Sequence, residues 1–124
     1  MIGGLGLAAA IGAHLLLGFA YATSTPLWQN PDEPAHFNYV AQVAETATLP
    51  ELRAGDWDSA LLERLKHGQL GPGESIASIR YESWQPPLYY LLAAPVYRLG
   101  SPEEPARVLR LRLLGVALGA LTLA

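Results

Sequence analysis

The stretch IGGLGLAAAIGAHLLLGFAYA, residues 2–22, decides the fold of this chain. It contains no charged side chain, and His14 is its only strongly polar residue. A helix of this length, rising about 1.5 Å per residue, spans about 30 Å, which is the hydrocarbon thickness of a bilayer. Its several glycines would weaken a helix in water but allow membrane helices to pack closely. We therefore predict a membrane-spanning helix within residues 1–25, with His14 in contact with a neighbouring helix.

A cleaved secretory signal peptide is the alternative interpretation, because Ala20-Tyr21-Ala22 resembles a signal peptidase site. However, no Lys or Arg precedes the apolar run, and the run is longer than the usual apolar core of a signal peptide. We therefore expect the span to be retained.

Composition points in the same direction. Hydrophobic residues make up 51% of the chain and charged residues only 15%, against about 25% charged in typical soluble domains. The net charge is −3, so no basic surface for nucleic acid is expected, and the lack of cysteine excludes disulfides and thiolate zinc sites. Residues 113–124 are again uncharged but too short to cross a bilayer. We interpret residues 106–124 as the start of a second membrane helix in the N-terminal part of a longer, polytopic protein.

The region between the two apolar segments, residues 26–105, is predicted to be a loop at the membrane surface. Apolar residues recur at helical spacing over residues 36–49 and 56–67, which predicts two amphipathic helices. Residues 86–97 are apolar, too short to span and rich in tyrosine, which is typical of a helix in the membrane interface. The predicted fold class is thus an all-α membrane protein with two transmembrane helices, the second truncated, joined by a loop with amphipathic interfacial helices.

Two similar stretches, NPDEPA at residues 30–35 and SPEEPA at residues 101–106, resemble helix starts. In each, a capping residue is followed by proline and, three residues after the cap, by glutamate, which fits a capping box. We therefore interpret Glu33 first as a capping residue, like Glu104.

Asp32 is different, because a capping box does not need it. It precedes His36 by four residues, so on a regular helix the two side chains share one face. Such a pair fits a base with its orienting partner, two ligands of a metal, or the commoner solvated Asp–His pair.

Three arginines lie in the first turns of the last predicted helix. They fit side chains that extend to lipid head groups, or residues that face a cavity and bind a phosphate through the bidentate guanidinium. Arg107 and Arg110 share a helix face, whereas Arg112 does not.

The uncharged first span, the DE motif, the PPLYY segment at residues 86–90 and the helix that begins ARVLRLRLLG at residue 106 occur in a familiar order. In this order the chain resembles the GT-C superfamily of polytopic glycosyltransferases, particularly bacterial relatives of the protein O-mannosyltransferases and of the lipid A aminoarabinose transferase. The resemblance covers essentially the whole chain, as the first two membrane helices and the first extracytoplasmic loop of such an enzyme.

The resemblance implies a multi-pass enzyme of the bacterial inner membrane with this loop outside. Such an enzyme transfers a sugar from a polyprenyl-phosphate donor to a hydroxyl of a glycan, lipid or protein acceptor, with inversion at the anomeric carbon. The fragment alone is expected to be inactive, because other helices would supply most of the donor cavity.

The resemblance also implies roles for individual residues. Asp32 matches the general base of the first loop, with Glu33 beside it as a second catalytic candidate. Arg107 matches the arginine that opens the second membrane helix. Together with Gln85 and Tyr89, it is predicted to line the active site or contact the donor phosphate.

The cofactor is left open, with a divalent metal as the candidate and Glu82 and His36 as its candidate ligands. Glu82 is the nearest match to a second loop acid that lies near a metal in some relatives. It stands four residues before Pro86 rather than two, and Gln85 stands where many relatives have histidine.

The charge distribution argues against the implied orientation. Every Lys and Arg follows the first span, so the positive-inside rule places the loop in the cytoplasm. The rule weakens for loops longer than about 60 residues, and we therefore follow the resemblance. The alternative from another class is a non-catalytic membrane protein whose helical extracytoplasmic loop binds a partner.

Overall fold

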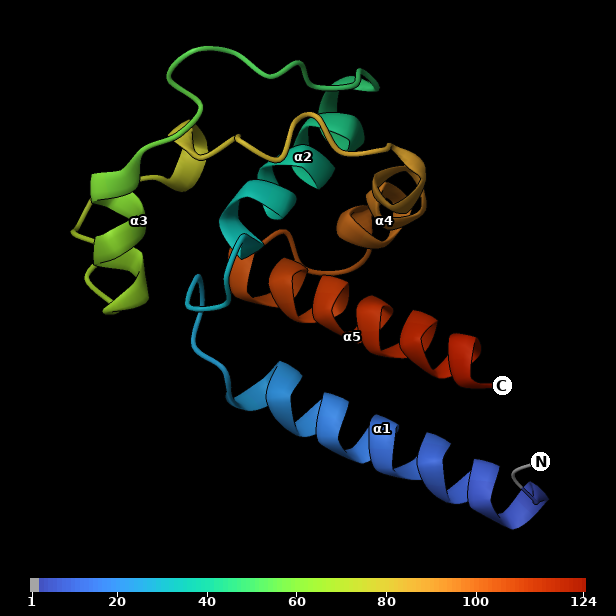
Figure 1. Cartoon of the computed structure of the whole chain (residues 1–124). Coiled ribbons are helices and arrows are strands. Elements are labelled where there is room, and N and C mark those ends of the chain that lie inside the picture. Colours follow the sequence, from blue (N-terminus) through green and yellow to red (C-terminus); the bar gives the residue numbers. More distant parts are fainter. Residues whose placement is uncertain (1–2) are drawn as a thin grey trace.

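The computed structural model describes residues 3–124. Within this range all regular secondary structure is helical and there is no strand, so the predicted all-α class is confirmed (Figure 1). The elements are α1 (Gly4–Ser24), α2 (Glu33–Thr46), α3 (Ser59–Lys66), a short 3-10 turn η1 (Ile76–Ser78), α4 (Leu88–Arg98) and α5 (Glu104–Leu123).

Helices α1 and α5 lie side by side in opposite directions and form a hairpin, with both ends of the chain at its far tip (Figure 1). Gly18 brings α1 close to Val116, and Gly119 leaves room for the ring of His14. The Nε2–H of His14 donates to the carbonyl oxygen of Val116 at 3.0 Å. The packing role predicted for His14 is therefore confirmed.

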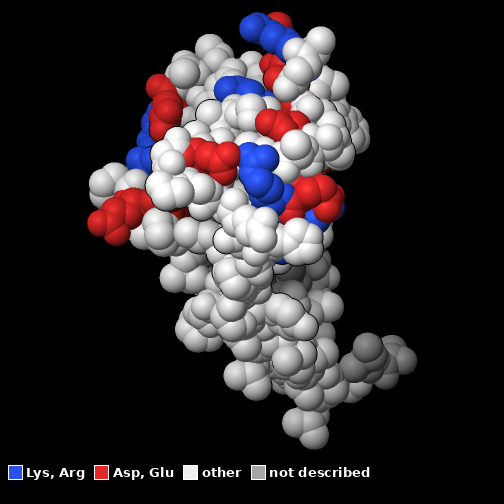
Figure 2. Space-filling view, turned by 90° about the vertical axis from the view of Figure 1, so that its left-hand side faces the viewer, with Lys and Arg blue, Asp and Glu red and all other residues white. Residues whose placement is uncertain are grey.

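The hairpin is apolar but largely uncovered. Helix α1 is the one helix of residues 3–124 that is long and apolar enough to cross a membrane, and Ala22 is its only buried residue. Leu5 and Leu16 are 88% and 71% exposed. In Figure 2 the charged side chains gather at the upper end of the molecule, whereas the lower end, formed by the hairpin, shows none.

Helix α5 does not meet the same criterion for a membrane span. At 20 residues, it retains all three of its arginines in any window long enough to cross a bilayer. The predicted second transmembrane helix therefore stays a prediction.

Above the hairpin, α2 packs against α4 and η1 and forms the core of the charged end. Tyr39 and Tyr90 stack with ring centroids 3.5 Å apart, and Val40 is fully buried beside them. Helix α4 buries Tyr90 and Tyr97 against this core and leaves other side chains exposed, among them Leu88, Leu91 and Leu92. Its amphipathic character is as predicted, while its place in the membrane interface stays a prediction.

The two predicted capping boxes are wrong. Helix α2 begins at Glu33 after Asp32, and α5 begins at Glu104 after Glu103; neither start has a side-chain cap. The second proline of each motif explains the shift. In a helix that began at Pro31, the amide of residue 34 would donate to the Asn30 carbonyl, but Pro34 has no N–H and its ring would clash there. The helix therefore begins where this proline falls in the first turn.

The other boundaries lie close to their predicted positions. Asp58 caps α3, since its carboxylate accepts from the Leu61 amide at 2.9 Å, so this helix begins three residues later than expected. Helix α2 ends at Thr46, because Ala47 adopts a left-handed conformation.

Candidate functional site

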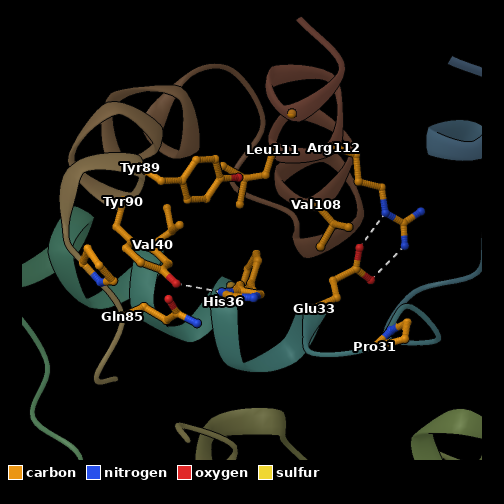
Figure 3. Close-up of a pocket in the computed structure, with 13 residues that line it drawn as sticks. Pro31, Glu33, His36, Val40, Gln85, Tyr89, Tyr90, Val108, Leu111 and Arg112 are labelled. Atoms are coloured by element: carbon orange, nitrogen blue, oxygen red, sulfur yellow. Dashed lines mark hydrogen bonds and ion pairs between the residues drawn. The ribbon is translucent and has the colours of Figure 1, made fainter. Parts of the chain in front are cut away.

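A cavity of about 510 Å³ lies between α2, α4 and α5, at the upper end of the hairpin (Figure 3). Four of the residues predicted for the site line this cavity: Glu33, His36, Gln85 and Tyr89. The remaining lining residues, mostly apolar, are Pro31, Phe37, Val40, Pro86, Tyr90, Val108, Leu111, Arg112 and Gly115.

The strongest polar contact in the wall joins Glu33 to Arg112. The Nε of Arg112 donates to Oε1 of Glu33 at 2.6 Å and its Nη2 donates to Oε2 at 2.8 Å, a bidentate pair. The two side chains are only 13% and 12% exposed. Sequence reasoning placed Arg112 on a separate face from Arg107 and Arg110 but gave it no partner, because its partner lies 79 positions away.

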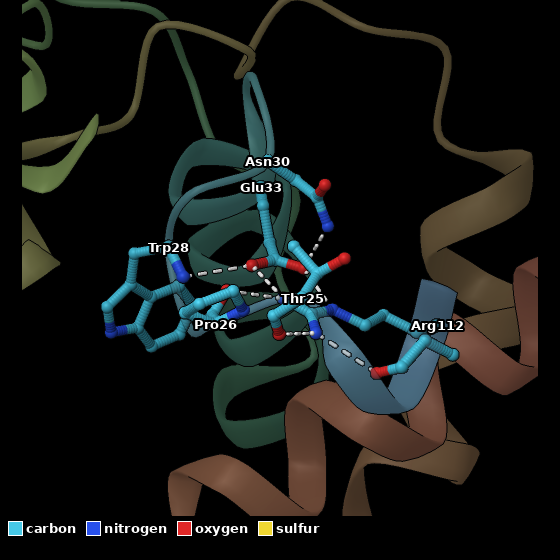
Figure 4. A network of polar contacts seen from close by, with 7 residues as sticks. Thr25, Pro26, Trp28, Asn30, Glu33 and Arg112 are labelled. Atoms are coloured by element: carbon cyan, nitrogen blue, oxygen red, sulfur yellow. Dashed lines mark hydrogen bonds and ion pairs between the residues drawn. The ribbon is translucent and has the colours of Figure 1, made fainter. Parts of the chain in front are cut away.

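The two carboxylate oxygens of Glu33 also accept hydrogen bonds from a strained turn at residues 28–30. Trp28 has a positive φ of 64°, an unfavourable conformation for a bulky residue. Its amide donates to Oε2 of Glu33 at 3.0 Å, and Nδ2 of Asn30 donates to Oε1 at 3.3 Å (Figure 4). The Trp28 ring is buried edge-on against Phe37, with centroids 5.1 Å apart. Glu33 thus fixes the loop that leads into α2.

Arg112 also closes the end of α1. Its Nη1 donates to the carbonyl oxygens of Ala22 and Thr25 at 3.1 and 2.6 Å, and its Nη2 donates to that of Pro26 at 3.1 Å. Carbonyls at a helix end have no partner within the helix. Together with the two bonds to Glu33, these contacts use all five N–H groups of the guanidinium.

Asp32 lies outside the cavity. Its φ of 63° turns it away from the helix that follows, and it borders a separate hollow of about 300 Å³ together with Trp57, Lys66 and Tyr81. The Tyr81 hydroxyl donates to Oδ1 of Asp32 at 2.5 Å. Burial raises the pKa of Tyr81, and this hydrogen bond raises it further, so the phenol stays protonated.

His36 lies on the cavity side, so the predicted shared face of Asp32 and His36 is wrong. The reason is that Asp32 precedes α2 in a left-handed conformation, and helical spacing does not apply to it. Instead, Nδ1 of His36 lies 2.7 Å from the hydroxyl of Tyr90. Burial raises the pKa of Tyr90, as does the nearby Glu82, so its hydroxyl stays protonated. It donates to Nδ1 or accepts from it, depending on the tautomer of His36. A neutral His36 that accepts this proton at Nδ1 carries its own proton on Nε2.

Gln85 connects the cavity to a buried acid. Its Nε2 donates to Oε2 of Glu82 at 2.7 Å, and Glu82 is only 9% exposed. Within residues 3–124 no three His, Cys, Asp or Glu side chains lie close enough together to hold a metal ion. The divalent metal, with Glu82 and His36 as its ligands, stays a prediction.

Arg107 lies outside the cavity lining and belongs to another network. Its Nη1 donates to the Tyr97 hydroxyl at 2.6 Å, and its guanidinium lies over the Tyr97 ring at 4.2 Å. The Tyr97 hydroxyl donates to Glu45 at 2.9 Å. Burial, followed by this hydrogen bond, raises the pKa of Tyr97 to about 12. Arg107 therefore holds the start of α5 against α4 and α2.

Comparison with known proteins gives no match: no family model fits the chain, and no curated protein or solved structure is significantly similar to it.

Proposed function

We propose that this chain is the N-terminal part of a polytopic, inverting glycosyltransferase of the GT-C type in the bacterial inner membrane. The enzyme moves a sugar from a polyprenyl-phosphate donor to an acceptor hydroxyl on the extracytoplasmic side. In this proposal residues 1–25 span the membrane, residues 26–105 face outside, and residues 106–124 begin the second span. The observation that carries the proposal is the cavity between α2, α4 and α5, where an apolar hairpin meets a polar wall.

The cavity suits a ligand that joins hydrocarbon to an anionic head. Val108, Leu111 and Gly115 form an apolar wall on α5, from which the uncharged part of the hairpin continues. The opposite side carries donors for a phosphate, namely the amide N–H of Gln85 that Glu82 does not use and, in the tautomer with its proton on Nε2, His36. Arg112 has no free N–H, but its charge offsets that of Glu33, so the wall presents no net negative charge to a phosphate.

We assign the general base to Asp32 and a positioning role to Glu33. Both Glu33 oxygens already accept from Arg112, whereas Asp32 is exposed and accepts from Tyr81 through one oxygen. During transfer, Asp32 takes the proton of the acceptor hydroxyl. At the same time the oxygen of that hydroxyl bonds to the anomeric carbon. The bond from that carbon to the phosphate oxygen breaks, and its electron pair leaves with polyprenyl phosphate.

The two sides of the reaction would meet at one turn. Pro31 lines both the main cavity and the hollow that contains Asp32. Donor and acceptor could therefore reach the same turn, residues 31–33, from two neighbouring spaces. Inversion requires that the acceptor oxygen and the leaving phosphate then lie on opposite faces of the anomeric carbon.

The test uses membranes that contain the complete protein, supplied with undecaprenyl-phosphate-linked mannose, glucose or aminoarabinose. We expect sugar-dependent release of undecaprenyl phosphate, and a fall of about 10²–10⁴-fold in Asp32→Asn, the range for loss of a general base. Glu103→Gln, an exposed acid that lines neither the main cavity nor the hollow of Asp32, is the control and should keep its activity. Equal rates in Asp32→Asn would remove Asp32 from the chemistry. No release from any donor would overturn the proposal in favour of a non-catalytic, partner-binding protein.

A further inference from the structure

A second hollow on the surface is lined by three aromatic rings beside the turn at residues 53–56. Trp57 and Trp84 are 61% and 64% exposed, although indole rings are among the side chains that gain most from burial. Trp57 packs against Tyr81 with ring centroids 4.4 Å apart. We call this hollow the aromatic groove and define it by Trp57, Tyr81 and Trp84, with Arg53 and Asp56 as the charged residues of its lining.

The turn beside the aromatic groove is held by hydrogen bonds. Oδ2 of Asp56 accepts from the Arg53 amide at 2.6 Å, and its carbonyl oxygen accepts from the Arg80 amide at 2.9 Å. Gly55 supplies the positive φ of 96° that this turn requires. Because Trp57 follows directly on this turn, the ring is presented without a flexible tether, which lowers the ordering cost of binding a ligand.

The aromatic groove is continuous with the surroundings of Asp32. Trp57 and Tyr81 line both the groove and the hollow that contains Asp32, and the Tyr81 hydroxyl donates to Asp32. A ligand that lies across these rings would therefore bring its end to the carboxylate.

We propose that the aromatic groove binds a pyranose ring of a saccharide and thereby places a sugar hydroxyl near Asp32. The role of this hydroxyl as the acceptor rests on the proposed function. The C–H groups on one face of a pyranose are slightly positive and fit the negative face of an aromatic ring. The hydroxyls of the sugar fit the two charged side chains of the lining, Arg53 and Asp56. These two charges cancel, and Arg53 also lies 3.5 Å from Glu51, so the groove has no excess positive charge for a lipid phosphate or a nucleic acid.

The experiment measures binding of neutral oligosaccharides to the complete protein in lipid nanodiscs. The probes are cellohexaose, maltohexaose and a linear mannan hexasaccharide. We expect one or more to bind, with about tenfold weaker affinity in Trp57→Ala and in Trp84→Ala, the usual effect of losing one stacking ring. Trp84 is the more exposed of the two, so its removal tests the groove without disturbing Tyr81. Leu92→Ala on α4, a 51% exposed side chain away from the groove, is the control and should bind like the unmodified protein.

Results that would overturn the proposal can be distinguished from one another. Absence of binding by all three probes, or equal binding by the tryptophan variants, overturns the proposal. Quenching of Trp57 and Trp84 fluorescence by brominated lipid also overturns it, because the groove would then lie on the bilayer. Release of undecaprenyl phosphate is measured separately, so saccharide binding without release would reject the transferase and retain the groove, and release without saccharide binding would do the reverse.

Discussion

Arg112 is the residue on which three parts of the chain converge. Its guanidinium contacts the end of α1 and the start of α2 from the third turn of α5. A buried ion pair stabilises a fold only when the remaining donors and acceptors of both partners are also satisfied. That condition is met here, because three carbonyl oxygens and the Trp28 amide complete the network.

Removal of this arginine should therefore be costly. In Arg112→Met, the Glu33 carboxylate and the carbonyls at the end of α1 lose their partner, and we expect a loss of about 3–5 kcal/mol in the free energy of unfolding. Equilibrium unfolding in detergent micelles measures this loss. Arg53→Met is the matched control, since Arg53 and Glu51 are 77% and 80% exposed, and it should cost about 0–1 kcal/mol. Equal losses in the two variants would show that the buried Glu33–Arg112 pair contributes no more to the free energy of unfolding than an exposed pair does.

Single residues also mark the limit of what the sequence predicts. The packing of His14 could be predicted because a single polar side chain on an apolar helix needs a hydrogen-bond partner, and a neighbouring helix supplies one. The position of Asp32 did not follow, because it depends on a left-handed residue that the spacing of side chains does not reveal. The presence of Pro34 was the available signal, since a proline four residues after a cap excludes a helix that starts at that cap.

At the level of elements, periodicity and composition predicted each α-helix and most of its extent. What they left open was which faces meet. Helix α4 reads as an interfacial helix by itself, and only the structure places its Tyr90 against Tyr39 of α2. Four predicted residues meet in one cavity because α2 and α4 pack together, while Arg107 and Asp32 lie elsewhere. These long-range contacts depend on shape complementarity between helices, which cannot be predicted from a single sequence.

The contact between α1 and α5 gives a prediction with an internal control. A Cβ at Gly18 would lie 2.8 Å from both methyl groups of Val116, whose branched side chain is stiff. Gly18→Ala should therefore lower the free energy of unfolding by about 1–3 kcal/mol through overpacking. At Gly12 nothing lies within 4 Å of the added Cβ, so Gly12→Ala should be neutral or stabilise the helix by up to about 1 kcal/mol.

Thermal unfolding of both glycine variants in the same detergent checks this order. A Gly18→Ala protein that unfolds at the same temperature as Gly12→Ala would contradict the close packing of α1 on α5.

For the whole molecule, the division between a charged end and an apolar hairpin is the main feature (Figure 2). The exposed leucines of α1 would be unfavourable in water and are favourable in hydrocarbon. The uncharged part of α5 continues beside α1, beyond the Glu33–Arg112 pair. This pair would then lie at the boundary, where its hydrogen bonds close the polar end of the hairpin.

Cysteine labelling gives a direct test of this arrangement and of the orientation, because residues 1–124 contain no cysteine and any cysteine elsewhere in the complete protein can be replaced by serine. In the complete protein, Glu63→Cys places a thiol on the exposed side of α3, and Leu16→Cys places one on α1 where the side chain is 71% exposed. A membrane-impermeant maleimide added to intact cells should label Glu63→Cys and leave Leu16→Cys unlabelled, because hydrocarbon excludes both the reagent and the thiolate. Labelling of Leu16→Cys in intact cells would contradict a membrane location for α1. Labelling of Glu63→Cys only after lysis would place the charged end in the cytoplasm, as the positive-inside rule indicates, and would remove the extracytoplasmic transferase with it.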